Sequence, residues 1–83
     1  EILGEIEGSV VSSMSRIDLG STLKDVLVMS GSKIGKDCKI TNTVVGEGVD
    51  IGTECILQNV ILGDGVIVEA GSNLNDCRIP NTN

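Results

Sequence analysis

The most reactive side chains in this chain are those of its three cysteines, Cys38, Cys55 and Cys77. Thiols can act as nucleophiles, bind metal ions or pair as disulfides, but these three show no C-x-x-C spacing and the chain contains no histidine. An odd number of cysteines without paired spacing fits neither a zinc site nor a closed disulfide framework. We therefore expect free thiols and a cytoplasmic protein.

Carboxylates are the second group that could do chemistry. The stretch Gly46-Glu47-Gly48-Val49-Asp50 superficially resembles a Gly-rich calcium or phosphate loop. It lacks both the calcium-binding nonapeptide and the G-x-G-x-x-G spacing, which favours an ordinary turn. We expect a solvated surface to account for the acidic residues, which include Asp37, Glu47, Asp50, Glu54, Asp64 and Glu69. Because no imidazole is present for acid–base chemistry, we assign no catalytic, cofactor-binding or metal-binding residue to this segment.

Composition limits the possible partners. The chain has 83 residues, a net charge of −6, six basic residues and no aromatic residue. Nucleic acid is therefore not expected as a partner, because counterion release and base stacking both lack the required side chains. No apolar run reaches the length of a bilayer span, so no membrane contact is expected either. We interpret residues 1–83 as a single domain and as part of a longer chain.

An internal repeat organises the whole sequence. Aliphatic residues recur in steps of five, six and six, so the same phase returns every 17 residues. One column of this repeat consists of Ile17, Ile34, Ile51 and Val68. A second consists of Ile6, Leu23, Ile40, Leu57 and Leu74, and a third of Val11, Val28, Val45, Leu62 and Ile79. Such steps are too long for a helix face and indicate short strands separated by turns.

The repeat predicts an all-β fold, a parallel β-helix solenoid of about five triangular coils. Two columns have the residue types that turns require, since Gly, Asn and Asp tolerate positive φ. One is Gly8, Asp25, Asn42, Asn59 and Asp76, and the other is Gly31, Gly48 and Gly65. Small inward slots precede the large aliphatics, and Cys38 and Cys55 occupy two of them. Their backbones should lie about 4.8 Å apart, so a disulfide between them stays the alternative to two inert, buried thiols.

Several units resemble the hexapeptide repeat of the left-handed parallel β-helix, [LIV]-[GAED]-x-x-[STAV]-x. Ile34-Gly35-Lys36-Asp37-Cys38-Lys39 and Ile51-Gly52-Thr53-Glu54-Cys55-Ile56 fit it well. The left hand is implied by this resemblance alone. The stretch from Thr41 to Gly52 further resembles a shortened unit found in the C-terminal tails of sugar-1-phosphate nucleotidyltransferases such as ADP-glucose and GDP-mannose pyrophosphorylases.

The resemblance implies a non-catalytic tail. The parent enzyme would join a sugar 1-phosphate to a nucleoside triphosphate, with Mg²⁺ in a separate catalytic domain. Two alternatives stay open. One is the tail of a guanine-nucleotide exchange factor subunit of translation initiation, which serves as an interaction scaffold. The other is a fragment of a hexapeptide acyltransferase that lacks its catalytic histidine.

The outward residues point to a contact surface. On the face formed by the five-residue steps, one outward position per coil is aliphatic, namely Val10, Leu27, Val44 and Ile61. We call these four residues the apolar stripe, and parallel strand spacing makes it about 14 Å long. We predict that it packs against the catalytic domain of the same chain, a second copy of the helix, or both. The alternative is that these β-branched residues only satisfy strand propensity.

Overall fold

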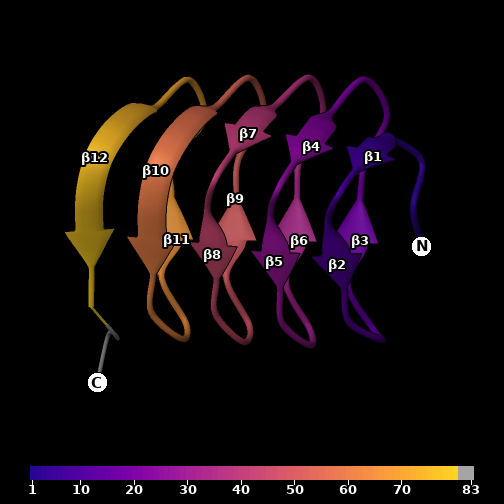
Figure 1. The fold of residues 1–83 in the computed structure, drawn as a ribbon, viewed down its shortest axis with the longest axis horizontal. Helices are drawn as coiled ribbons and strands as arrows, with labels where there is room; N and C mark the ends of the chain where they lie inside the picture. The colour runs from indigo at the N-terminus through magenta and orange to yellow at the C-terminus, as the bar shows by residue number, and fades with distance from the viewer. Residues whose placement is uncertain (81–83) are drawn as a thin grey trace.

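A computed structural model describes residues 1–80 of the chain. Within these residues the fold is a parallel β solenoid of about four turns without helices, against the about five coils expected for the whole chain. Figure 1 shows the coils stacked side by side along the long axis of the molecule. The strands are β1 (Glu5–Glu7), β2 (Val10–Val11), β3 (Arg16–Ile17), β4 (Thr22–Lys24), β5 (Leu27–Val28), β6 (Lys33–Ile34), β7 (Lys39–Thr41), β8 (Val44–Val45), β9 (Asp50–Ile51), β10 (Ile56–Leu62), β11 (Ile67–Val68) and β12 (Asn73–Ile79).

Strands one coil apart pair in parallel and in register, which gives the molecule three faces. One face consists of β1, β4, β7 and the starts of β10 and β12, and a second of β2, β5, β8 and the ends of β10 and β12. The third consists of β3, β6, β9 and β11. Ile17 pairs with Ile34, Ile34 with Ile51, and Ile51 with Val68. The predicted 17-residue column is therefore confirmed.

The core is the axis onto which all three faces send their large aliphatic side chains. Fully buried members include Ile34, Ile51 and Leu57, each 1% exposed. Fully burying such a side chain contributes roughly 1.5–3 kcal/mol, so the stacked columns are the main source of stability. The end coils have a neighbouring coil on one side only, and their inward residues are partly buried, namely Ile6, Val11, Leu74, Cys77 and Ile79.

The corners follow the predicted turn columns, and the structure adds a third. Asp25, Asn42, Asn59 and Asp76 all have positive φ, between 48° and 55°. Within the same column the Asn59 side-chain amide donates a 2.9 Å hydrogen bond to the Asp76 carboxylate. The second predicted column, Gly31, Gly48 and Gly65, also has positive φ. The third, which the sequence interpretation did not identify, consists of Gly20, Asp37, Glu54 and Gly71.

In the last two coils, a single long strand takes the place of two of the three short strands predicted per coil. β10 and β12 each run for seven residues through the corner at Asn59 and Asp76. Gln58 pairs with Asn75 before this corner, and Val60 pairs with Cys77 after it. β12 ends at Ile79, directly before Pro80, which has no N–H for a further ladder.

Candidate functional site

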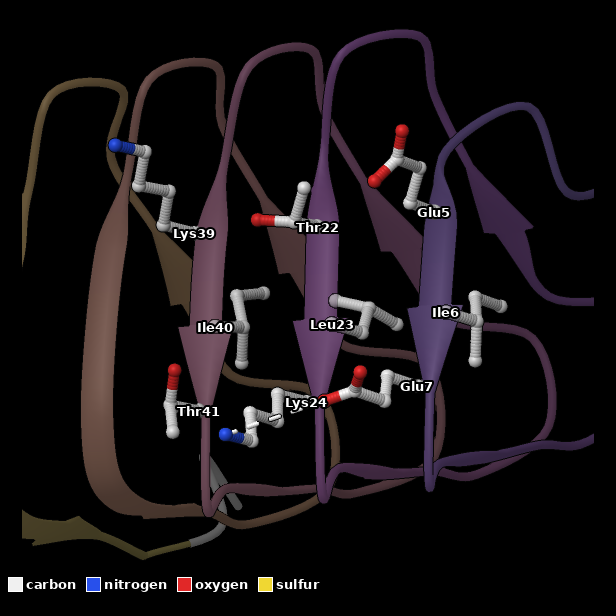
Figure 2. Close-up of a pocket in the computed structure, with 9 residues that line it drawn as sticks. All are labelled: Glu5, Ile6, Glu7, Thr22, Leu23, Lys24, Lys39, Ile40 and Thr41. Carbon is white, nitrogen blue, oxygen red and sulfur yellow. Dashed lines mark ion pairs between the residues drawn. The ribbon is translucent and has the colours of Figure 1, made fainter.

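A hollow of about 610 Å³ lies on the outer face of β1, β4 and β7. Figure 2 shows its side chains in three rows, with an aliphatic row between two polar ones. The dashed line marks the 3.9 Å ion pair between Lys24 Nζ and Glu7 Oε2. The other polar lining residues are Glu5, Thr22, Lys39 and Thr41. The acidic side chains lie on β1 and the basic ones on β4 and β7 of this open strand surface, and no nucleophile with an adjacent base is assembled there. Among residues 1–80, no group of three or more His, Cys, Asp or Glu side chains is placed to hold a metal ion.

The predicted buried position of Cys38 and Cys55 is confirmed, and both are free thiols with 0% exposure. The slot they occupy has a polar function that we did not predict. Cys38 Sγ donates a 3.1 Å hydrogen bond to the Gly52 carbonyl, and Cys55 Sγ donates one of 3.1 Å to the Glu69 carbonyl. Burial raises the pKa of the Cys38 thiol, which keeps it protonated as a donor. These thiols therefore join neighbouring coils and are not placed for nucleophilic chemistry.

Serine fills equivalent slots in other coils and makes the same contact. Ser21 Oγ donates to the Gly35 carbonyl at 2.5 Å and accepts a 3.0 Å hydrogen bond from the Cys38 backbone N–H. On another face Ser32 Oγ donates to the Gly46 carbonyl at 2.6 Å. At these positions the small slot therefore holds a donor that reaches the backbone of the following coil, whereas Val49 and Val66 fill slots equivalent to that of Ser32 without a donor. From the sequence, the small residues in these slots indicated only that the space is too narrow for a large side chain.

The Gly-rich stretch 46–50 is a corner of the solenoid, as predicted. Gly48 has a φ of 63°, and the Glu47 backbone N–H donates a 2.8 Å hydrogen bond to the Asp64 carboxylate of the next coil. Glu47 and Asp50 are exposed on different sides of this corner, and Val49 between them is buried. This stretch therefore forms a backbone turn, and its two carboxylates do not converge on a common site.

The apolar stripe lies on the outside of the face formed by β2, β5, β8 and the end of β10. Its members are in register, because Val10 pairs with Leu27, Leu27 with Val44, and Val44 with Ile61. Val10 is 62% exposed, Leu27 37% and Ile61 47%, and Val44 is partly buried. The predicted outward position is thus confirmed for all four residues, and Arg78 follows them in β12.

The other two faces carry mixed outward columns. Glu5, Thr22, Lys39 and Ile56 follow one another on the first face. Arg16, Lys33, Asp50 and Ile67 follow one another on the third. Each of these columns has one aliphatic residue, so the second face is the one with an uninterrupted apolar column across four coils.

Further exposed apolar residues lie in the first coil and beside it, and the sequence interpretation did not single them out. They are Ile2, Leu3, Met14 and Leu19. Ile2 pairs with Ile17, only 15 residues ahead, so the 17-residue register begins after it, with Glu5 opposite Thr22.

Two comparisons with known proteins bear on the family. A scan against protein-family models matches residues 6–83 to the GMPPB C-terminal domain, where GMPPB is GDP-mannose pyrophosphorylase B, a sugar nucleotidyltransferase. A search of the curated proteins finds no match. No helix in the described part of the chain is long and apolar enough to cross a membrane. The family match spans nearly the whole solenoid and confirms the resemblance to sugar-nucleotide pyrophosphorylases, so the chain belongs to the GMPPB C-terminal domain family.

Proposed function

We propose that this chain is the non-catalytic β-helix domain of a sugar-nucleotide pyrophosphorylase and that it serves subunit assembly and domain packing. Nucleotidyl transfer to the sugar 1-phosphate, together with its Mg²⁺, belongs to a separate catalytic domain in this proposal. The family match supports this assignment over the exchange-factor and acyltransferase alternatives. A cytoplasmic location fits the three free thiols.

The observation that carries the proposal is the apolar stripe. A strand surface facing water usually presents polar residues, and four stacked aliphatic side chains form a continuous apolar column instead. Each member still has surface to bury, and covering it contributes on the order of 1 kcal/mol per residue. The stripe as a whole therefore offers several kcal/mol to any surface that packs against it.

The test is a matched pair of substitutions in β10 of the full-length protein. Ile61 belongs to the apolar stripe and is 47% exposed, whereas Ile56 lies on the neighbouring face of the same strand and is 45% exposed. Strand propensity, residue type and exposure are thus equal, and only the face differs. Ile61→Lys should reduce the mass of the assembled particle in light scattering or expose the domain junction to limited proteolysis, and Ile56→Lys should do neither.

Val44→Lys provides an independent position on the same stripe and should act as Ile61→Lys does. Circular dichroism controls for unfolding, because all three variants should retain the β spectrum of the parent. If Ile61→Lys and Val44→Lys left both particle mass and proteolysis unchanged, the stripe would be no more than strand propensity and the proposal would be wrong.

A further inference from the structure

The corner between the second and third faces contains the one aspartate or asparagine of the sequence that is directly followed by glycine, Asp64 before Gly65. In the same corner column the residues before the other two glycines are Ser30 and Glu47. An aspartate side chain can close a five-membered ring with the next backbone nitrogen, whereas serine has no carbonyl carbon and glutamate would need a larger ring. Glycine leaves that nitrogen accessible, because it has no Cβ.

Both reacting groups are held by the backbone of the preceding coil. The Asp64 carboxylate accepts a 2.8 Å hydrogen bond from the Glu47 N–H, 17 residues earlier. The Gly65 N–H donates a 2.8 Å hydrogen bond to the Glu47 carbonyl. Glu47 therefore holds the carboxylate and the amide proton that ring closure consumes. Gly65 has a φ of 73°, a conformation that glycine adopts without strain, so the turn itself requires the residue that makes this bond labile.

We propose that the Asp64–Gly65 bond is a site of spontaneous isoaspartate formation, which the closed corner suppresses and which local opening of the C-terminal coils permits. In the first step the Gly65 nitrogen bonds to Asp64 Cγ, and the hydroxyl of the neutral carboxyl group leaves as water together with the proton from nitrogen. Water then adds at the main-chain carbonyl carbon of Asp64 and breaks its bond to nitrogen. The product has the mass of the parent, and its main chain is one carbon longer.

The modification acts on the strands that follow the corner. Ile67 of β11 pairs with Asp50, and β12 pairs with β10 in register. An extra main-chain carbon between β10 and β11 strains this register and moves the carboxylate away from Glu47. Isoaspartate at position 64 therefore destabilises the C-terminal coils and marks the molecules in which those coils have opened.

The C-terminal end is well placed to open locally. Leu74 in β12 is only partly buried, whereas Leu57, its equivalent one coil earlier, is 1% exposed. Coils of a solenoid contact only their neighbours, so an end can separate while the rest stays folded. β11 and β12 follow the Asp64 corner in the chain, so opening that proceeds inward from β12 reaches this corner.

Peptide mapping of the full-length protein after incubation at neutral pH measures isoaspartate at position 64. The folded parent should isomerise at least about tenfold more slowly than the chain in urea, because both hydrogen bonds of Glu47 must break first. Leu74→Ala should raise the rate in the folded protein about tenfold, the change that corresponds to about 1.4 kcal/mol in the opening equilibrium. Ile79→Val, a milder change in the same strand, should raise it by a smaller factor, and circular dichroism confirms that both variants stay folded.

Two control variants make the result specific. Ile6 is also partly buried and occupies the same column as Leu74 at the other end of the solenoid, so Ile6→Ala should leave the rate unchanged. Asp64→Glu keeps a carboxylate and should remove the isoaspartate signal.

The proposal would be overturned by equal rates in the folded parent and in urea, because Glu47 would then give no protection. It would also be overturned by equal acceleration in Leu74→Ala and Ile6→Ala, since opening would then involve the whole solenoid. A signal that persists in Asp64→Glu would assign the modification to another residue. All of these outcomes are independent of the apolar stripe, because none of the variants changes one of its members.

Discussion

Replacing Cys38 tests whether its slot is defined by size or by hydrogen bonding. The side chain is fully buried, and its thiol donates to the Gly52 carbonyl at 3.1 Å. Cys38→Val keeps an apolar side chain of comparable size and removes the donor. Cys38→Ser keeps a donor, loses the apolar sulfur, and adds an acceptor for the backbone of the next coil, as Ser21 Oγ provides for Cys38 itself.

Packing alone predicts that Cys38→Val is more stable than Cys38→Ser. The hydrogen bond predicts the opposite order of stability. An acceptor left unsatisfied in the interior costs about 1–3 kcal/mol, and since a thiol is a weak donor we expect Cys38→Val to lose about 1–2 kcal/mol. For Cys38→Ser the lost sulfur burial and the stronger hydroxyl bond roughly cancel, which leaves stability within about 1 kcal/mol of the parent.

Urea unfolding measures this difference. An m value near 1 kcal/mol/M is typical of a small domain, so Cys38→Val should unfold at a midpoint about 1 M below that of Cys38→Ser. The slope m should stay the same in both variants, which confirms that only stability has changed. If Cys38→Val were as stable as the parent and Cys38→Ser were clearly weaker, the slot would be purely steric and the hydrogen-bond account would be wrong.

Two further predictions concern alkaline stability and the close packing of coils. Burial raises the pKa of the Cys38 thiol above its ordinary value of 9.0, so the unfolded chain ionises first as pH rises. The contribution of this thiol is therefore complete below pH 9.0 and should be lost as pH rises through the folded pKa, and Cys38→Ser should flatten that part of a urea-midpoint profile against pH. Gly52→Ala would place its Cβ 2.6 Å from the backbone nitrogen of Ala70, so thermal unfolding should occur at least several degrees lower. Gly48→Ala meets no atom within 4 Å and should cost only about 1 kcal/mol for its positive φ, and equal losses in the two variants would contradict the close-approach argument.

Most of the fold could be predicted because a solenoid repeats one local pattern. The column of Ile17, Ile34 and Ile51 follows from counting, since parallel strands in register must bring residues one period apart together. The corner at Asn42 and Asn59 follows from residue types that tolerate positive φ. Stacking one coil on another then determines which side chains point inward and which point outward.

Other features depend on contacts that the repeat does not encode. The thiol and hydroxyl bonds of Cys38 and Ser21 reach a carbonyl 14 residues ahead, so their geometry depends on how the coils are offset. The corner containing Asp37 and Glu54 escaped prediction because these residue types resemble ordinary surface charges. For the apolar stripe, the sequence indicates an outward position, whereas the repeat does not encode any surface that packs against it.

Solvent access to the apolar stripe in the full-length protein is the most direct test of the account. Thiols introduced separately by Ile61→Cys and Ile56→Cys, in a Cys77→Ser background, should be labelled by a maleimide at different rates. Their parent side chains are 47% and 45% exposed in the isolated solenoid, so equal rates are expected if nothing covers either face. We predict at least tenfold slower labelling at position 61, and equal rates at the two positions would contradict the assignment of the stripe as a contact surface.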